Sequence, residues 1–499
     1  MNKKTLSFLI LLLCGTVMAY ANGTKIGNIY YILDGDNLTA SVTWGGGKYN
    51  SGTDEYTEAI TIPATVTDEE NKTYTVTSIG NDAFQGCNLL TSVDIPDGVE
   101  CIKDHAFCDC SGLTSITIPS SVTSIGVSAF EGCRSLTSVS IPSSVTSIGA
   151  SAFNGCRSLT SVSIPSSVTS IGFSAFYGCL SLTSVDISNG VECIKDSAFY
   201  GCSSLTSVSI PSSVTSIGAS AFLGCNLLTS VDIPDGVECI EAGTFVMCLS
   251  LTSVDIPNGV ECIKDYAFCG CRSLTSVSIP SSVTSIGASA FYDCNLLTSV
   301  NIPDGVTSID NEVFSGCSGL TSITIPSGVT SIGRDAFRSC TGLASIVVLA
   351  ANPPELGEDA FYGETSTTPV YVPNADTYKN KNWGGFENIK EPAAYKSVAL
   401  SEITVAKQSA TSAYLNGLVE ANEKAIEATD DLEAICNYKD EAISKIQFAK
   451  QAYQAMTSEA LGSLGTKQNG PAVKVTKNGK TVILYHPEKV EFIKISTNE

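Results

Sequence analysis

Cysteine is the reactive residue that this sequence places most regularly. Twelve of its 20 cysteines follow one another at intervals of 23 residues, from Cys87 to Cys340. Each lies three residues after a phenylalanine, which predicts small buried side chains that fill one repeated slot. A second column of cysteines replaces a serine of the unit in four copies: Cys101, Cys193, Cys239 and Cys262. Only Cys239 and Cys262 occupy adjacent units, so they are the candidate disulfide, provided that the Cβ geometry permits a bridge.

Few other residues suggest catalysis or metal binding. The two histidines, His105 and His486, lie far apart in the sequence, and neither belongs to a Ser-His-Asp or Cys-His pattern. The runs Cys108-Asp109-Cys110 and Cys269-Gly270-Cys271 resemble metal motifs, but a closed zinc site needs four convergent ligands. The 23-residue period already accounts for Cys110 and Cys271. We therefore expect no enzyme, no cofactor and no resident metal.

The chain is strongly acidic, with a formal net charge of −22. Such a charge argues against nucleic acid as a partner, because phosphate binding needs clustered Lys and Arg. Some units are neutral (VSIPSSVTSIG) and others acidic (VDIPDGVECIKD), and two acidic units are adjacent at residues 225–270. Stacking would bring Asp232 beside Asp255 and Glu238 beside Glu261. The sequence leaves three interpretations open: a solvated surface, a weak calcium site or a patch for a basic ligand.

The cysteines belong to a unit of 23 residues that occurs twelve times between residues 84 and 340 without an insertion. In the copy CRSLTSVSIPSSVTSIGASAFNG (133–155), LTSVSI alternates as a strand does, with Val139 inward and Ser140 outward. Pro142 ends that strand, SSVTSI forms a second apolar stretch, and Gly149 permits the following turn. SAF brings Phe153 into the core on one helical or 3₁₀ turn. A unit this short must stack on its neighbours, so the period predicts a solenoid.

Stacking would align the outward strand positions into one stripe along the solenoid. A rigid stripe of small hydroxyls and carboxylates could bind a large partner through many modest contacts. We name these residues the strand stripe: Thr117, Ser140, Ser163, Asp186, Ser209, Asp232, Asp255, Ser278, Asn301 and Thr324.

The pattern LxxLxIPxxVxxIGxxAFxxC resembles the BspA-type, or treponemal-type, leucine-rich repeat that is common in surface proteins of Bacteroidetes. The resemblance covers residues 60–391. It implies a right-handed leucine-rich repeat solenoid with a parallel β-sheet and short turns or 3₁₀ segments. It also implies adhesion to host matrix or surface proteins, and in some members co-aggregation with other bacteria.

The segments that flank the repeats differ from them in composition. Residues 1–21 are a predicted signal peptide, with Lys3 and Lys4, an apolar run and the Ala19-Tyr20-Ala21 cleavage site. Residues 22–59 are a predicted N-terminal β cap with a turn at Asp34-Gly35. A C-terminal cap from about residue 341 closes the repeats, with Tyr378, Trp383 and Phe386 covering the last apolar face.

Two further segments follow the repeats. Residues 398–460 are rich in Ala, Glu, Lys and Gln, which predicts a helical hairpin or stalk whose second helix begins near Asp430. Asn422 and Lys439 fall on its apolar seam. Residues 471–499 form a predicted small β module with a turn at Asn478-Gly479, serving as an outer-membrane sorting signal or a structural cap.

These observations lead to one expected function and one alternative. We expect a secreted protein, associated with the cell surface or outer membrane, that binds host matrix or surface proteins or other bacteria. It would be a monomer without a transmembrane span in the mature chain. The alternative is a periplasmic or envelope spacer that has no specific ligand.

Overall fold

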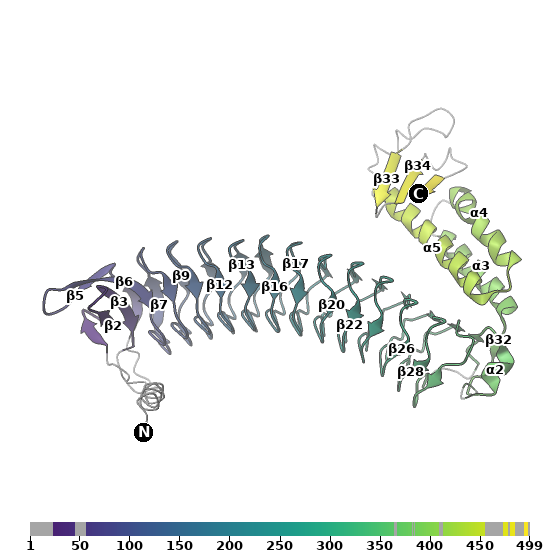
Figure 1. The fold of residues 1–499 in the computed structure, drawn as a ribbon, viewed down its shortest axis with the longest axis horizontal. Helices are drawn as coiled ribbons and strands as arrows, with labels where there is room; N and C mark the ends of the chain where they lie inside the picture. Colours follow the sequence, from purple (N-terminus) through teal and green to yellow (C-terminus); the bar gives the residue numbers. More distant parts are fainter. Residues whose placement is uncertain are drawn as a thin grey trace, which may run out of the picture. The chain divides into compact units, whose positions relative to one another are not determined.

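The 23-residue units stack as the turns of a solenoid in this computed structural model (Figure 1). The structure describes residues 23–44, 56–363, 367–381, 383, 385–408, 413–454, 473–477, 480–484 and 494–497. The predicted signal peptide lies outside these residues. The chain divides into two compact units. The first comprises residues 1–320, 332–342 and 357–363, and the second comprises 321–331, 343–356 and 364–499.

Each turn of the first unit begins with a strand made by the LTSVSI segment. These strands form three sheets, and within each sheet neighbouring strands pair in parallel and in register, for example Ser138 with Ser115 and Val139 with Ile116. The alternation is as predicted, with Val139 buried and Ser138 and Ser140 exposed. These strands are β4 (Glu58–Thr61), β7 (Leu90–Asp94), β9 (Ser115–Thr117), β11 (Ser138–Ser140), β13 (Ser161–Ile164), β15 (Ser184–Ile187), β17 (Ser207–Ser209), β19 (Ser230–Val231), β21 (Ser253–Asp255), β23 (Ser276–Ser278) and β25 (Ser299–Val300).

A second parallel ladder comes from the VTSI segment. Ile148 pairs with Ile171 and is buried, while Thr146 is exposed. The strands are β6 (Thr73–Ile79), β8 (Cys101–Ile102), β10 (Ser124–Ile125), β12 (Ser147–Ile148), β14 (Ser170–Ile171), β16 (Cys193–Ile194), β18 (Ser216–Ile217), β20 (Cys239–Ile240), β22 (Cys262–Ile263), β24 (Ser285–Ile286) and β26 (Ser308–Ile309).

The segment that carries the phenylalanine is a series of tight turns instead of the expected helical or 3₁₀ turn. Helical backbone is interrupted twice, because Ser151 (φ 55°) and Gly155 (φ 70°) both lie in the left-handed region. The backbone N–H of Phe153 donates to the Ala175 carbonyl of the next turn at 2.8 Å, so this side also forms a ladder between turns. Inside it, the phenylalanine rings stack from Phe84 to Phe361 at centroid separations of 5.0–5.7 Å.

Gly149 has a different role from the one predicted. Its φ is outside the left-handed region, so the turn does not need glycine for conformational reasons. A Cβ at Gly149 would instead lie 2.5 Å from the carbonyl carbon of Gly126 in the preceding turn. The residue is therefore small because two backbones approach each other closely.

The N-terminal cap covers the first end of the stack with β1 (Thr24–Ile26), β2 (Ile29–Asp34) and β3 (Thr39–Thr43), which pair antiparallel. The turn predicted at Asp34-Gly35 is the connection between β2 and β3, in which the Asp34 carboxylate accepts the backbone N–H of Asp36 at 3.0 Å and of Asn37 at 3.1 Å. β5 (Thr65–Thr67) pairs antiparallel with β6. Tyr56 is buried, and its ring lies 4.9 Å from that of Phe84.

The second unit begins with further repeat strands and a cap. β27, β29, β31 and β32 form one parallel sheet. Tyr378 and Trp383 are fully buried, and they donate to the carbonyl oxygens of Ala350 (2.6 Å) and Pro354 (3.0 Å). Phe386 is half-buried against Trp383. The elements here are β27 (Ser322–Ile325), β28 (Ser331–Ile332), β29 (Ser345–Val348), β30 (Glu355–Leu356), β31 (Val370–Tyr371), α2 (Ala375–Lys379) and β32 (Ile389–Lys390).

Three helices follow where a hairpin or stalk was expected: α3 (Pro392–Gln408), α4 (Ala413–Ala428) and α5 (Leu432–Gln454). The first begins at Pro392, a residue favoured in the first turn of a helix because its missing N–H needs no partner there. The charge of Lys439 on the predicted seam is buried but compensated. Its Nζ lies 3.1 Å from the Tyr395 hydroxyl, 3.1 Å from Glu402 and 3.3 Å from Asp440.

The described residues of the C-terminal module form three antiparallel strands, β33 (Val473–Lys477), β34 (Lys480–Leu484) and β35 (Lys494–Thr497), in the order β33-β34-β35. The predicted turn residues Asn478 and Gly479 lie outside the described residues.

Candidate binding surfaces

The structure aligns the strand stripe along the first unit as the pattern predicts. Its nine residues from Thr117 to Asn301 are all exposed. Ser163 pairs with Asp186, Asp186 with Ser209, and Asp232 with Asp255 through an isolated bridge. Thr324 belongs to β27 of the second unit, where it pairs with Val347 and is half-buried.

The stripe also has a further member that was not predicted. Asp94 in β7 is exposed and pairs with Thr117, so it occupies the same column one turn earlier. Its place in the period was visible in the sequence. The column therefore holds four carboxylates in the first unit, from Asp94, Asp186, Asp232 and Asp255, and no lysine or arginine.

Beside the stripe runs a column of threonines whose hydroxyl protons are already used. The Oγ1 of Thr160 donates to the Thr137 carbonyl at 3.3 Å, and that of Thr183 donates to the Thr160 carbonyl at 3.0 Å. In the stripe itself, Ser163 Oγ donates to Asp186 Oδ2 at 3.2 Å. These threonine and serine hydroxyls can therefore accept hydrogen bonds from a ligand, and the carboxylates add negative charge. This face favours partners rich in hydrogen-bond donors.

The cysteine ladder is buried and chemically inert. Each ladder thiol from Cys110 to Cys340 donates to the carbonyl of a phenylalanine 26 residues earlier, for example Cys225 to Phe199 at 3.4 Å. Burial raises the pKa of Cys225 well above its usual value and that of Cys202 to about 12. A thiol held protonated is a poor nucleophile and a poor metal ligand.

The second column of cysteines, at positions 101, 193, 239 and 262, lies on the strands formed by the VTSI segment. Cys239 and Cys262 are paired across β20 and β22 and joined by a disulfide, with Cα atoms 4.8 Å apart. Cys101 and Cys193 are half-buried free thiols, because their neighbouring turns carry serine at that position. The Sγ of Cys193 lies 3.8 Å from Ser216 Oγ.

The described histidine lies beside one carboxylate on the surface. His105 Nδ1 lies 3.9 Å from Asp82 on the surface, and His486 is outside the described residues. Within the residues that the structure describes, no group of three or more His, Cys, Asp or Glu side chains could hold a metal ion. In the adjacent acidic units, Glu241 forms an ion pair with Lys264 at 2.7 Å.

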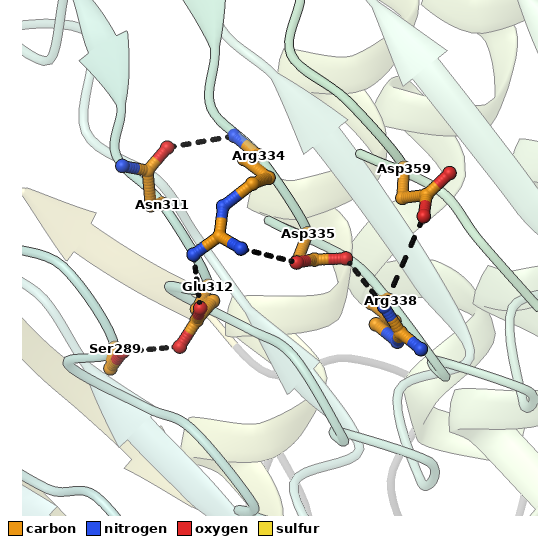
Figure 2. A network of polar contacts seen from close by, with 7 residues as sticks. All are labelled: Ser289, Asn311, Glu312, Arg334, Asp335, Arg338 and Asp359. Atoms are coloured by element: carbon orange, nitrogen blue, oxygen red, sulfur yellow. Dashed lines mark hydrogen bonds and ion pairs between the residues drawn. The ribbon is translucent and has the colours of Figure 1, made fainter.

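A cluster of polar side chains in the last turns of the first unit is internally paired (Figure 2). Arg334 Nη2 donates to Glu312 at 2.9 Å, and Glu312 also accepts from Ser289 Oγ at 3.1 Å. Arg338 Nη1 donates to the buried Asp335 at 3.0 Å. With its charges satisfied by neighbours, the cluster ties adjacent turns together and leaves no unpaired arginine in this group for an anionic ligand.

A second exposed feature, not predicted from the sequence, is a run of apolar residues at the position directly after each core phenylalanine. In six consecutive turns this position holds an apolar side chain that is half-buried or exposed. We name these residues the apolar row: Tyr177, Tyr200, Leu223, Val246, Cys269 and Tyr292. The same six residues form a column in the sequence, one position after each phenylalanine, so this signal was visible there.

Comparison with known proteins assigns the repeats to a family. The sequence model of the protein family described as BspA type leucine rich repeat region matches overlapping segments of this chain that together span residues 70–411. This chain belongs to the BspA-type leucine-rich repeat family. Members of this family are described as surface proteins, and leucine-rich repeats commonly bind other proteins.

Two solved structures of leucine-rich repeat proteins are similar to this chain. A leucine-rich repeat protein from Bacteroides ovatus is 29% identical with a TM-score of 0.57, and the match covers 74% of this chain and 99% of that chain. A leucine rich cell surface protein from Faecalibacterium prausnitzii is 32% identical with a TM-score of 0.47, over 74% of this chain and 94% of the other. No curated protein matches this BspA-type chain.

In the described part of this BspA-type protein, no helix has both the length and the apolar character needed to cross a membrane.

Proposed function

We propose that this BspA-type repeat protein is an adhesin-like protein of the cell surface that binds host matrix or surface proteins, or other bacteria, without catalysis. The observation that supports the proposal is the strand stripe, whose nine residues from Thr117 to Asn301 place exposed hydroxyl, carboxylate and amide groups on strands that pair in parallel within their sheets. Because every turn repeats the same contacts, a long partner can bind through many weak interactions at once.

The chemistry of the stripe defines the side of the partner that it binds. The hydroxyl protons of the flanking threonines are engaged by backbone carbonyls, and the stripe bears only acidic charges in the first unit. A partner surface with Lys, Arg or free backbone N–H groups complements it, and its ion pairs on an exposed face weaken with salt.

The test is a binding panel with the purified mature chain, residues 22–499. Matrix proteins and whole bacteria are immobilised, and bound protein is measured at increasing ionic strength. The proposal predicts saturable binding to at least one surface, with an affinity that falls as salt rises. A protein that serves only as a periplasmic or envelope spacer would bind none of them saturably, and that outcome would contradict the proposal.

A further inference from the structure

The apolar row is a contiguous surface feature of one part of the solenoid. The preceding turns carry Glu131 and Asn154 at the same position, and the following turns carry Ser315 and Arg338. Between them, six consecutive turns place aromatic or aliphatic side chains or a thiol there. The rings of Tyr177 and Tyr200 stack with their centroids 4.6 Å apart, so these two members of the row are in contact across neighbouring turns.

Further exposed apolar side chains lie within four residues of members of the row in the sequence. Phe173 is 53% exposed, Leu180 43%, Met247 43% and Tyr266 51%. A Cβ added to Gly270 would lie 2.9 Å from the Sδ of Met247. Met247 therefore lies next to the following turn, which contains Cys269. An exposed apolar surface of this extent is typical of a protein interaction site, since isolated apolar residues are normal but adjacent ones are not.

The spacing of the turns indicates the shape of the partner. The phenylalanine rings under the row, from Phe176 to Phe291, are separated by 5.4, 5.4, 5.7, 5.4 and 5.4 Å. An α-helix has a pitch of about 5.4 Å, so a helix lying along the row presents one apolar side chain per turn of the solenoid. An extended strand repeats its side chains on one face every ~6.7 Å and loses register within a few turns.

The charges beside the row indicate the flanks of that helix. Asp196 and Asp265 occupy the position of Phe173 in their own turns and are exposed. Asp293 lies directly after Tyr292 in the sequence and forms an ion pair with Arg272 at 3.6 Å. The chain as a whole carries −22. A complementary helix therefore carries Lys or Arg beside its apolar stripe.

We propose that the apolar row is a docking surface for an amphipathic α-helix of a partner protein, with one apolar stripe bordered by basic residues. The proposal rests on the proposed binding function and assigns part of it to a surface other than the strand stripe. Helix recognition through apolar anchors at i, i+3, i+4 and i+7 is a general mode of protein recognition.

The test uses the full mature chain and a fluorescein-labelled peptide of leucine and lysine with leucines on one helical face. A peptide of the same composition and charge but scrambled order is the matched probe. We expect the patterned peptide to bind at least tenfold more tightly than the scrambled one, as measured by fluorescence anisotropy. Equal binding of the two peptides would show a purely electrostatic attraction and overturn the proposal.

Two asparagine variants locate the site without changing the charge. Leu223→Asn lies in the row, and Leu89→Asn alters a leucine that is 56% exposed several turns away. We expect Leu223→Asn to weaken binding at least tenfold and Leu89→Asn to change it less than twofold, with both variants keeping the circular dichroism spectrum of the parent. Unchanged binding by Leu223→Asn, or a dimer of the parent chain that this variant dissociates, would contradict the proposal. Neither result bears on matrix binding through the strand stripe, which the binding panel tests.

Discussion

The thiol of Cys156 donates a hydrogen bond to the carbonyl oxygen of Phe130, 3.2 Å away. The same contact recurs between turns along the cysteine ladder, so the slot requires a small side chain that is both apolar and a weak donor. Alanine would fill less of the slot and leave the carbonyl without this donor. Serine would supply a stronger donor but would bring a more polar group into the core.

Alkaline pH should destabilise the solenoid through these thiols. Burial raises the pKa of Cys202 and Cys317 to about 12 from an ordinary value of 9.0. Below pH 9 both the folded and unfolded chains keep these protons, so the contribution to stability is fully present. Between pH 9 and 12 the unfolded chain loses protons that the folded chain retains, and stability falls by about 1.4 kcal/mol per thiol and pH unit. Urea unfolding without oxygen at pH 7.5 and 10.5 measures this loss.

One substitution separates the thiols from the tyrosines and lysines that also titrate. Cys202→Ala should unfold at lower urea than the parent at pH 7.5 because it leaves a cavity. Its loss of stability between pH 7.5 and 10.5 should nevertheless be smaller than that of the parent. An identical loss in the two proteins would show that the ladder thiols do not set the alkaline limit.

A buried phenylalanine of the stack should contribute more to the free energy of unfolding than an exposed phenylalanine elsewhere in the unit. Phe245 is fully buried in the stack, whereas Phe173 is 53% exposed. We expect Phe245→Ala to lower the free energy of unfolding by about 3–5 kcal/mol, and Phe173→Ala to change it by less than about 1 kcal/mol. Chemical denaturation of the two variants, which share the same chemical change, provides the comparison. A similar cost at both positions would contradict the stacked core.

The disulfide should stabilise the two adjacent acidic turns that it joins. Cys239 and Cys262 close a loop with a sequence separation of 23, which corresponds to roughly 3 kcal/mol of stabilisation in the chain-entropy model. Cys262→Ser should lose about that amount and expose a free thiol at Cys239. Cys193→Ser, in the same column but unpaired, should change stability little. Thiol alkylation followed by peptide mass spectrometry checks the pairing, and alkylated Cys239 in the non-reduced parent would contradict it.

Charge reversal on the strand stripe should weaken binding to a donor-rich partner. Asp232 and Asp255 are adjacent and exposed, so Asp232→Lys with Asp255→Lys adds two repulsive charges without disturbing the core. We expect affinity for a matrix ligand found in the binding panel to fall at least tenfold, which is about 1.4 kcal/mol. The control, Glu238→Lys with Glu261→Lys, makes the same charge change in the same two turns but beside the strands that carry Cys239 and Cys262. It should lower the affinity less. Equal effects would move the site away from the strand stripe.

The periodic part of the fold was predictable from the sequence because each position has one task in every turn. Burial of Leu136, Val139, Ile141 and Phe153 and exposure of Ser140 follow directly from the alternation of apolar and polar residues. The reason for Gly149 was not predictable, because it depends on a backbone contact with another turn. Sequence periodicity shows which side chains share a column but not how closely the backbones of two successive turns approach each other.

The helices outside the repeats were harder to predict, because each position occurs only once and a single polar residue can obscure the apolar pattern. Asn422 and Lys439 looked like defects in a heptad seam, and they argued for a simple hairpin. In the structure both are buried and partnered, since Asn422 donates to the Tyr438 carbonyl at 3.1 Å and Lys439 contacts Tyr395. A third helix, α3, supplies Tyr395 and Glu402 to these contacts, and its start at Pro392 was missed.

Protease shaving of intact producing cells, with peptide mapping across residues 22–391, tests the central claim most directly. If the protein is a surface adhesin, repeat peptides appear in the supernatant while a cytoplasmic marker stays inside the cells. Accessible lysines and arginines such as Lys264 and Arg334, each about half-exposed, give trypsin several cleavage sites along the first unit. If repeat peptides are released only after the outer membrane is broken, the adhesin account is wrong and the solenoid acts inside the envelope.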